Sequence, residues 1–301
     1  MKIERREFLG STVVGMGTAL ASGRISSAAP ADVDPTAVVP LGRILKVTRI
    51  GAGTGMRGGM RQTNQTRLGR EKFEALLRYT YDEGIRMFDV ADLYGTQPYV
   101  GRALKDKPRD SYVLVSKVWW RPGGLPEKER PDADVCIKRF LKELQTDYID
   151  LVQLHCVTSP KWPQELRKQM DIMAELKRKG IIRSHGVSCH SVGALTAAAE
   201  EPWVDVVHAR INPYGVKMDD KSPRKVVPVL EKIHAARKGV IGMKLIGEGQ
   251  FRDDDQKREE SVRWVMGLGC VDTMVVGFEK PEEIDDFKAR VRRTLLARTS
   301  G

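Results

Sequence analysis

Short runs of apolar residues alternate along the chain with longer stretches in which apolar residues recur every three or four positions. The short runs are bounded by Gly, Asp or Pro, and they predict buried strands at residues 49–53, 85–89, 112–116, 149–154, 183–188, 204–210, 240–243 and 273–276. The longer, amphipathic stretches predict helices at residues 70–83, 99–105, 133–144, 164–179, 192–200, 223–237, 255–268 and 281–296. Eight strand-then-helix units therefore follow one another.

This alternation predicts an α/β fold with a parallel sheet, because parallel strands need helices to cover them. Eight such units favour a closed eight-stranded (β/α)8 TIM barrel over residues 46–301. A dinucleotide-binding open sheet is the alternative, and the glycines around Gly51 and Gly53 match its phosphate turn only in part. No acidic residue closes a second strand at the distance which that fold requires, so we favour the barrel.

The first 31 residues differ in composition from the rest of the chain. The pair Arg5 and Arg6 precedes an apolar, Gly- and Ala-rich run at 11–22 and small residues at 27–31, an order typical of a twin-arginine-type signal peptide. We therefore expect export through the translocation machinery to the periplasm or cell envelope, or a cytoplasmic location if the signal does not function. The apolar run is too short for a stable membrane span, and residues 32–45 are interpreted as a linker.

Composition excludes several classes of protein. A chain of 301 residues with 41% hydrophobic residues can bury one large core. The net charge of +11 is spread along the chain without a basic run interleaved with aromatics, so we expect no nucleic-acid partner. The four cysteines form no CxxC pair and have no zinc-type spacing.

Polar residues with reactive side chains follow three successive predicted strands. Asp89 ends the second strand, and Tyr94 comes five residues later. Lys117 ends the third strand and His155 the fourth. Because the carboxyl ends of barrel strands form one mouth, we expect these four side chains to converge.

Such a group can move a proton to or from a substrate oxygen. An ammonium beside a phenol favours the phenolate, so Lys117 is expected to lower the pKa of Tyr94, with Asp89 orienting Lys117 and His155 positioning the oxygen. No side chain can supply a hydride, so the chemistry calls for a nicotinamide or comparable carrier. The predicted partner is a small-molecule carbonyl or alcohol.

The motifs Phe-Asp-x-Ala-x-x-Tyr-Gly, Ser-Lys-Val-Trp, Leu-His and Gly-Val-Ser, in this order, resemble those of the aldo-keto reductase family from about Leu41 to Leu296. The resemblance implies an NAD(P)(H)-dependent oxidoreductase that reduces an aldehyde, ketone or sugar-like carbonyl to an alcohol, or the reverse. It makes Tyr94 the general acid and base, with Asp89, Lys117 and His155 completing a tetrad. It also implies NADP(H) or NAD(H) as cofactor.

By the same resemblance, further residues lie near the cofactor or the substrate. Trp119 and Trp120 are candidates for the substrate wall, together with Tyr94 and His155. Three candidates depart from the family's usual residues: Cys189 replaces an Asn, His208 a Gln, and Met243 an aromatic ring. The cofactor candidates are Thr54, Asp89, Ser188, Cys189, His208, Met243, Lys244, Gly277, Lys280 and Glu283.

The region that binds the 2′-phosphate in many family members differs most. Glu283 stands approximately where those members have an Arg, and a carboxylate near the ribose repels a phosphate. This favours NAD(H) as a hypothesis, while Lys280 could still bind a phosphate. The plainer alternative is that Glu283 only stabilises the first turn of a helix.

Three other interpretations remain open. The first is a nucleotide-binding redox sensor of the same fold with little turnover, and the second is a metal-assisted lyase or isomerase. We expect no metal, although a soft metal could in principle bind among His155, Cys156, Cys189, His190 and His208. The third is a Cys156–Cys189 disulfide after export, which the spacing neither requires nor excludes.

Overall fold

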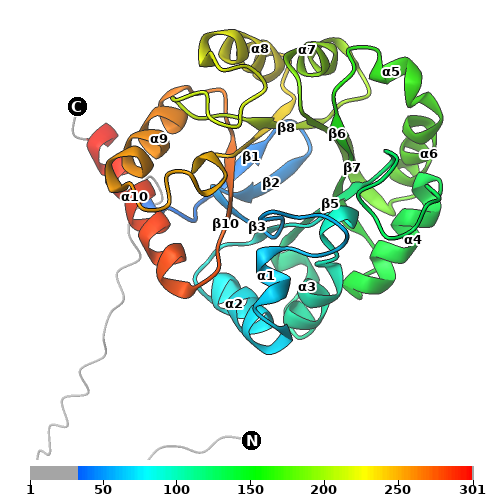
Figure 1. Cartoon of the computed structure of the whole chain (residues 1–301), viewed down its shortest axis with the longest axis horizontal. Helices are drawn as coiled ribbons and strands as arrows, with labels where there is room; N and C mark the ends of the chain where they lie inside the picture. The colour runs from blue at the N-terminus through cyan, green and yellow to red at the C-terminus, as the bar shows by residue number, and fades with distance from the viewer. Residues whose placement is uncertain (1–32, 300–301) are drawn as a thin grey trace, which may run out of the picture.

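Eight parallel strands close into a barrel in the computed structural model, which describes residues 33–299 (Figure 1). The strand order around the barrel is β10-β3-β4-β5-β6-β7-β8-β9, and each neighbouring pair is parallel. The predicted (β/α)8 TIM barrel is confirmed. Its strands are β3 (Ile50–Gly53), β4 (Met87–Asp89), β5 (Val113–Val118), β6 (Ile149–Val157), β7 (Ile182–Cys189), β8 (Val206–Arg210), β9 (Gly239–Met243) and β10 (Thr273–Gly277).

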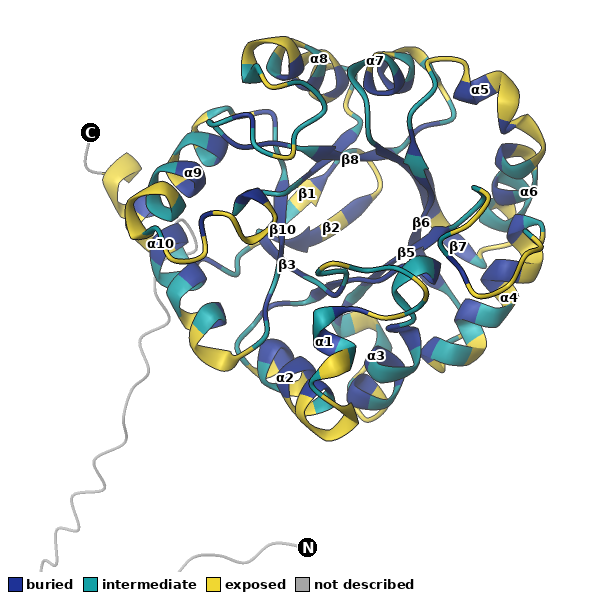
Figure 2. Ribbon diagram, in the orientation of Figure 1, coloured by how far each residue is buried: buried dark blue, intermediate teal, exposed yellow. Residues whose placement is uncertain are grey.

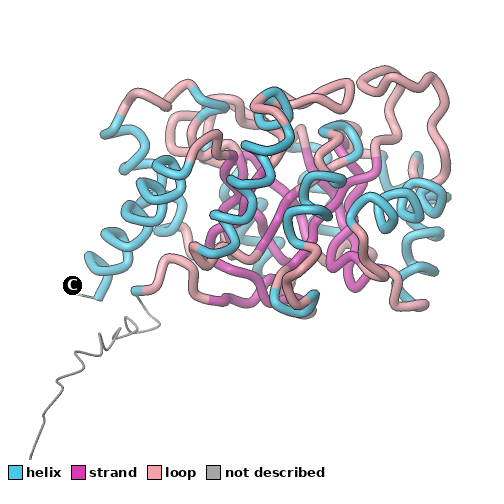
Figure 3. The backbone as a smooth tube through the Cα atoms, turned by 90° about the horizontal axis from the view of Figure 1, so that it is seen from below, coloured by secondary structure: helices cyan, strands magenta, loops and turns pink. Residues whose placement is uncertain are grey.

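The helices surround the strands on the outside, with their exposed faces turned to solvent (Figures 2 and 3). Two of them, α4 (Ala133–Leu144) and α7 (Val192–Glu200), have the bounds predicted from the sequence. The predicted helix 164–179 is instead divided, at Leu166, into α5 (Trp162–Glu165) and α6 (Arg167–Arg178). The other helices are α1 (Asn64–Arg67), α2 (Arg70–Asp82), α3 (Gln97–Leu104), α8 (Pro223–Ala235), α9 (Asp255–Gly267) and α10 (Pro281–Thr299), with 3-10 turns η2 (Asp92–Tyr94), η3 (Arg109–Ser111) and η4 (Gly247–Gly249).

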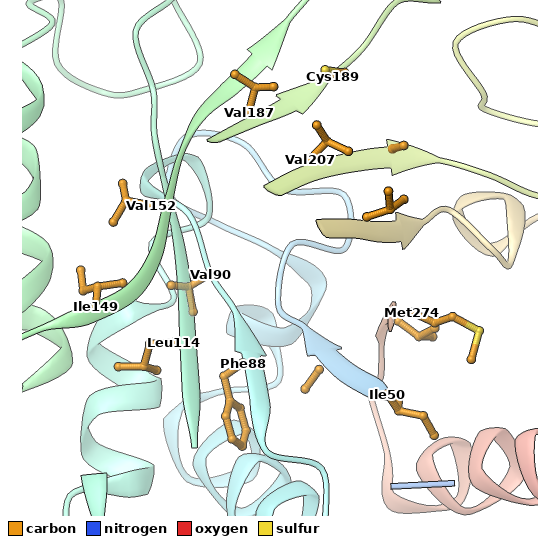
Figure 4. Close-up of a cluster of buried hydrophobic side chains, with 14 of the residues drawn as sticks. Ile50, Phe88, Val90, Leu114, Ile149, Val152, Val187, Cys189, Val207 and Met274 are labelled. Atoms are coloured by element: carbon orange, nitrogen blue, oxygen red, sulfur yellow. The ribbon is translucent and has the colours of Figure 1, made fainter. Parts of the chain in front are cut away.

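The apolar side chains of the barrel strands form two cores. One set faces the helices, and Figure 4 shows part of it, including Phe88, Val152 and Val207. The other set fills the lower barrel interior with apolar side chains from six strands. It comprises Met87, Val115, Leu151, Val206, Ile241 and Val275. Two residues further along several of these strands, polar residues take over, so that the site forms on top of an apolar floor.

An antiparallel hairpin closes this floor. It is formed by β1 (Val38–Leu41) and β2 (Leu45–Thr48), whose Leu41, Leu45 and Val47 are buried against the inner apolar set. The hairpin lies inside the ring of strands in Figure 1. The predicted linker at residues 32–45 therefore differs from the structure from Val38 onward, because these residues pack into the barrel.

The signal peptide predicted for residues 1–31 lies outside the described residues, so that interpretation stays a prediction. No helix within residues 33–299 is both long and apolar enough to cross a bilayer. All four cysteines are free thiols, so Cys156 and Cys189 are not linked to each other.

Candidate active site

A buried ion pair forms the base of the site. The ammonium of Lys117, on β5, donates to Oδ1 of Asp89, at the end of β4, and also to the carbonyl oxygen of Val90 at 3.2 Å. Nε2 of His208, on β8, lies 3.2 Å from the same Asp89 oxygen. Burial opposes ionisation of Asp89, but Lys117 and His208 outweigh it and lower the pKa of the carboxyl. The pair therefore stays ionised around neutral pH.

Tyr94 and His155 stand above this pair. The phenol oxygen of Tyr94 lies 3.4 Å from Nε2 of His155, and the two rings meet edge to face with centroids 5.4 Å apart. The Lys117 ammonium lies 5.4 Å from the centre of the Tyr94 ring. All four residues predicted to form the tetrad are thus brought together, from β4, η2, β5 and β6.

The pKa of Tyr94 differs from the sequence-based expectation. Burial, followed by the Asp89 carboxylate, raises it well above 10, where Lys117 was expected to lower it. The reason is that Lys117 already pairs with Asp89, and burial lowers the pKa of its own ammonium. Tyr94 is therefore a neutral phenol that retains its proton.

Loops on both sides fix the position of the Tyr94 ring. A methyl group on Gly55 would lie 2.3 Å from the ring carbon Cζ, and one on Gly58 would lie 2.8 Å from Cδ1, so the loop after β3 passes directly over the phenol. In the turn that carries Tyr94, buried Asp92 forms ion pairs with Arg61 at 3.2 Å and Arg139 at 2.8 Å. Sequence reasoning did not identify these supports.

His155 is a neutral imidazole held by its neighbours. Burial, then the charge of Lys117, lowers its pKa well below 6.5. Trp119 packs edge to face on the His155 ring with centroids 5.4 Å apart, and its role as a wall of the substrate site stays a prediction. The indole N–H of Trp120 donates to the His155 carbonyl oxygen at 2.8 Å, and its place in the substrate wall stays a prediction.

A cleft of about 290 Å³ runs from Asp89 and Tyr94 across the ends of β9 and β10 to the start of α10. Among the predicted cofactor residues, Asp89, Met243, Lys244, Gly277 and Glu283 line it. Arg57, Asn64, Arg252 and Arg258 also line it and were not identified from the sequence, and so does His190, which the sequence suggested only as a possible metal ligand.

Other predicted cofactor residues lie beside this cleft or away from it. Thr54 is buried, and its hydroxyl donates to the Asp89 carbonyl oxygen at 2.8 Å, so it holds the strand that carries Asp89. Ser188 and His208 are also buried, on adjacent strands at the same level. Lys280 is exposed and is not part of the lining.

The structure corrects the prediction that Cys189 binds the cofactor. Its side chain is fully buried in the core between barrel and helices, together with Val187 and Val207 (Figure 4). Alternate residues of a strand face opposite sides, so Ser188 and Cys189 cannot both face the interior. Cys189 is therefore not a cofactor-binding residue.

The far end of the cleft carries arginines paired with carboxylates. Arg252 donates to Glu279 and lies 3.6 Å from Glu283, whose other carboxylate oxygen accepts from the backbone N–H of Glu279 at 2.7 Å. Arg258 pairs with Asp286 at 3.0 Å. Across residues 33–299, no cluster of His, Cys, Asp and Glu side chains has the arrangement of a metal site.

Among curated proteins, the chain is similar to a dehydrogenase and to an aldo-keto reductase. D-arabinose 1-dehydrogenase of Saccharomyces cerevisiae is 32% identical over 136 residues, or 42% of this chain and 39% of that protein. Aldo-keto reductase YhdN of Bacillus subtilis is 27% identical over 232 residues, or 72% of this chain and 66% of that protein. The chain thus matches less than two thirds of the length of these curated relatives.

Solved structures share the fold. PA4992 of Pseudomonas aeruginosa, classed with the aldo-keto reductases, superposes with a TM-score of 0.69 at 25% identity, covering 87% of this chain and 97% of that one. An aldo/keto reductase of Klebsiella pneumoniae, solved with NADP and acetate, has a TM-score of 0.63 at 23% identity, covering 84% of this chain and 89% of that one.

The model of the aldo/keto reductase family matches residues 49–263, which is more than two thirds of the chain and contains all four residues of the tetrad. This match, with the closed barrel and the converging side chains, leads to one conclusion: the chain belongs to the aldo/keto reductase family.

Proposed function

We propose that the protein is an NAD(P)(H)-dependent oxidoreductase that reduces the carbonyl of a small aldehyde, ketone or sugar-like compound, or oxidises the alcohol in reverse. One observation carries the proposal: a neutral Tyr94 phenol lies 3.4 Å from the Nε2 atom of neutral His155, above the ionised Lys117–Asp89 pair. Proton donors around one point suit an oxygen atom that becomes negative during the reaction.

Each side chain has a separate task in this mechanism. Tyr94 gives its proton to the carbonyl oxygen as negative charge develops there, and the nearby Lys117 ammonium stabilises the resulting phenolate. His155 donates a hydrogen bond from Nε2 to the same oxygen, which fixes the substrate's orientation. Asp89 keeps Lys117 charged and in place.

The residues of the cleft fit a nicotinamide nucleotide, which supplies or accepts the hydride when bound. Arg57 and Lys244 are cations of the lining suited to its phosphates, and the cleft continues to Tyr94, where the reacting carbon must lie. Met243 offers a thioether face to a flat ring. The Klebsiella pneumoniae relative solved with NADP supports the same class of cofactor.

NAD(H) is the form of the cofactor that we propose. Arg252 forms ion pairs with Glu279 and Glu283, and Arg258 forms one with Asp286. Neither arginine is therefore a free partner for a 2′-phosphate. The Glu283 carboxylate lines the cleft and would repel that phosphate, whereas it can accept a hydrogen bond from a ribose hydroxyl.

Steady-state reduction of 4-nitrobenzaldehyde and glyceraldehyde with NADH or NADPH tests the function. Tyr94→Phe is expected to lower kcat by about 10²–10⁴-fold while the dissociation constant for the nucleotide changes little. Equal rates in the variant and the parent contradict the role of Tyr94. A single stoichiometric oxidation of bound nucleotide, without further turnover, indicates the sensor in place of the enzyme.

A further inference from the structure

Three cations lie close enough to His190 to act on its charge. Arg121 follows β5, Arg210 ends β8 and Lys244 follows β9. Between them lie Cys156 and His190, whose Sγ and Nε2 atoms are 3.4 Å apart. Burial, then the charges of Arg210, Lys244 and Arg121, lowers the pKa of His190 to about 3, so the imidazole is neutral and adds nothing to the positive potential.

Two of these cations have carboxylate partners. Nε of Arg210 donates to Oδ1 of buried Asp219 at 2.5 Å, while its Nη2 donates to the His190 carbonyl oxygen at 2.9 Å. Lys244 donates to Glu248 at 3.1 Å. Their charges are therefore largely balanced within the protein.

Arg121 is different, because its side-chain contacts within residues 33–299 involve no carboxylate: Nη1 donates to the Cys156 carbonyl oxygen at 3.3 Å, and the guanidinium lies 6.0 Å from the centre of the Trp120 ring. No carboxylate lies within ion-pair distance of Arg121 in that part of the chain. The neighbouring Trp120 is anchored to the carbonyl oxygen of catalytic His155, so the segment is held against the strand end that carries the reaction. A partly buried guanidinium without a carboxylate partner thus lies against the carbonyl of Cys156, the residue that follows His155.

We infer that the substrate of the proposed carbonyl reduction is anionic, with its carboxylate or phosphate bound by Arg121 while its carbonyl oxygen meets Tyr94 and His155. The inference rests on the proposed function and specifies its substrate class. A planar guanidinium offers a fork of donors that matches both anionic groups, and burial strengthens the interaction. Arg210, which is paired with Asp219, is held beside His190 and leaves Arg121 as the cation without a carboxylate partner.

The test compares aldehydes of matched shape. In the parent, kcat/KM for 4-carboxybenzaldehyde is expected to exceed that for neutral 4-carbamoylbenzaldehyde by about 10- to 100-fold. This ratio corresponds to the free energy of one charge-assisted hydrogen bond. Arg121→Gln brings this ratio to about 1. Lys128→Gln, which removes the same charge from an exposed position on the same loop, leaves the ratio as in the parent. Glyceraldehyde 3-phosphate against glyceraldehyde shows whether phosphate is preferred to carboxylate.

A ratio near 1 in the parent for both pairs overturns the inference. An Arg121→Gln variant that loses activity equally on charged and neutral aldehydes also overturns it, because Arg121 then only supports the loop. If no aldehyde is reduced at all, the proposed function fails. The anion site is then tested separately, by measuring the affinity for terephthalate through the quenching of tryptophan fluorescence. Binding that Arg121→Gln weakens at least about tenfold, but Lys128→Gln does not, supports the anion site, and equal binding to all three proteins rejects it.

Discussion

The phenol oxygen of Tyr94 lies 3.4 Å from Nε2 of His155, although the two residues are 61 positions apart in the chain. They come from different elements, η2 and β6, and their rings are nearly perpendicular at 87°. This arrangement places two neutral hydrogen-bond donors around one point, which is the feature on which the proposed chemistry depends.

His155→Phe removes one donor while keeping a ring that can pack on Trp119. We expect kcat/KM for carbonyl reduction to fall about 10²–10³-fold, as when one donor to a developing oxyanion is deleted. Nucleotide affinity, measured by fluorescence titration, should change little because His155 does not line the nucleotide cleft. An unchanged kcat/KM would remove His155 from the mechanism.

Gly55→Ala is expected to displace the Tyr94 phenol, the proposed proton donor. The added methyl group would lie 2.3 Å from Cζ of Tyr94, and a displacement of about 1 Å costs roughly 10²-fold in rate. Gly59→Ala is the matched control, because a methyl group at that position of the same loop meets nothing within 4 Å. Neither glycine has a positive φ, so backbone strain does not enter the comparison. Similar kcat values for the two variants would contradict the close contact.

Glu283→Gln should increase the affinity for NADPH. The change removes a negative charge from the cleft and releases Arg252 from one of its carboxylates, so the dissociation constant for NADPH is expected to fall about fivefold, equivalent to ~1 kcal/mol. Glu282→Gln alters the same helical turn at an exposed residue outside the lining and serves as the control. If NADPH already binds the parent far more tightly than NADH, the proposed NAD(H) preference is wrong.

Acid should destabilise the fold through His190. Its pKa is lowered from 6.5 to about 3, so between these values the unfolded chain takes up a proton that the folded protein excludes. The free energy of unfolding therefore falls as pH drops through this interval, by up to about 1.4 kcal/mol per pH unit for this group. Urea unfolding at about pH 7 and about pH 5 should show a smaller loss in His190→Asn than in the parent. Identical losses would show that His190 is not the responsible group.

Export depends on the arginine pair if the signal prediction holds. Replacing both Arg5 and Arg6 by Lys is expected to remove most of the protein from the periplasmic fraction, since the twin-arginine pathway recognises that pair. Arg24→Lys, a like change later in the same segment, should leave export intact. Cell fractionation with immunoblotting gives the answer, and unchanged export of the paired variant would contradict the twin-arginine assignment.

The sequence was most informative where each strand and helix follows a repeating pattern. The helices at 133–144 and 192–200 were predicted to the residue, and Asp89, Lys117 and His155 were placed at strand ends that the barrel then brought together. The β1–β2 hairpin was missed, because its four-residue strands follow a Pro- and Ala-containing stretch and are stabilised by packing against six barrel strands.

The directions of side chains and the contacts made by loops were harder to predict from the sequence. Cys189 was assigned to the cofactor because it follows Ser188, yet strand alternation turns it toward the helices. The strand alternation that separates these two residues could have been read from the sequence. The role proposed for Arg121 could not, because the position of its side chain depends on a contact with the Cys156 backbone that only the folded chain creates.

The hairpin that fills the lower end of the barrel also restricts where ligands can enter. With Leu41, Leu45 and Val47 packed beneath the Asp89–Lys117 layer, nucleotide and substrate must share the upper opening. If one of the two lies deeper than the other, we expect it to bind first and to leave last. Product-inhibition kinetics would then show an ordered cycle that follows from the closed floor of the barrel.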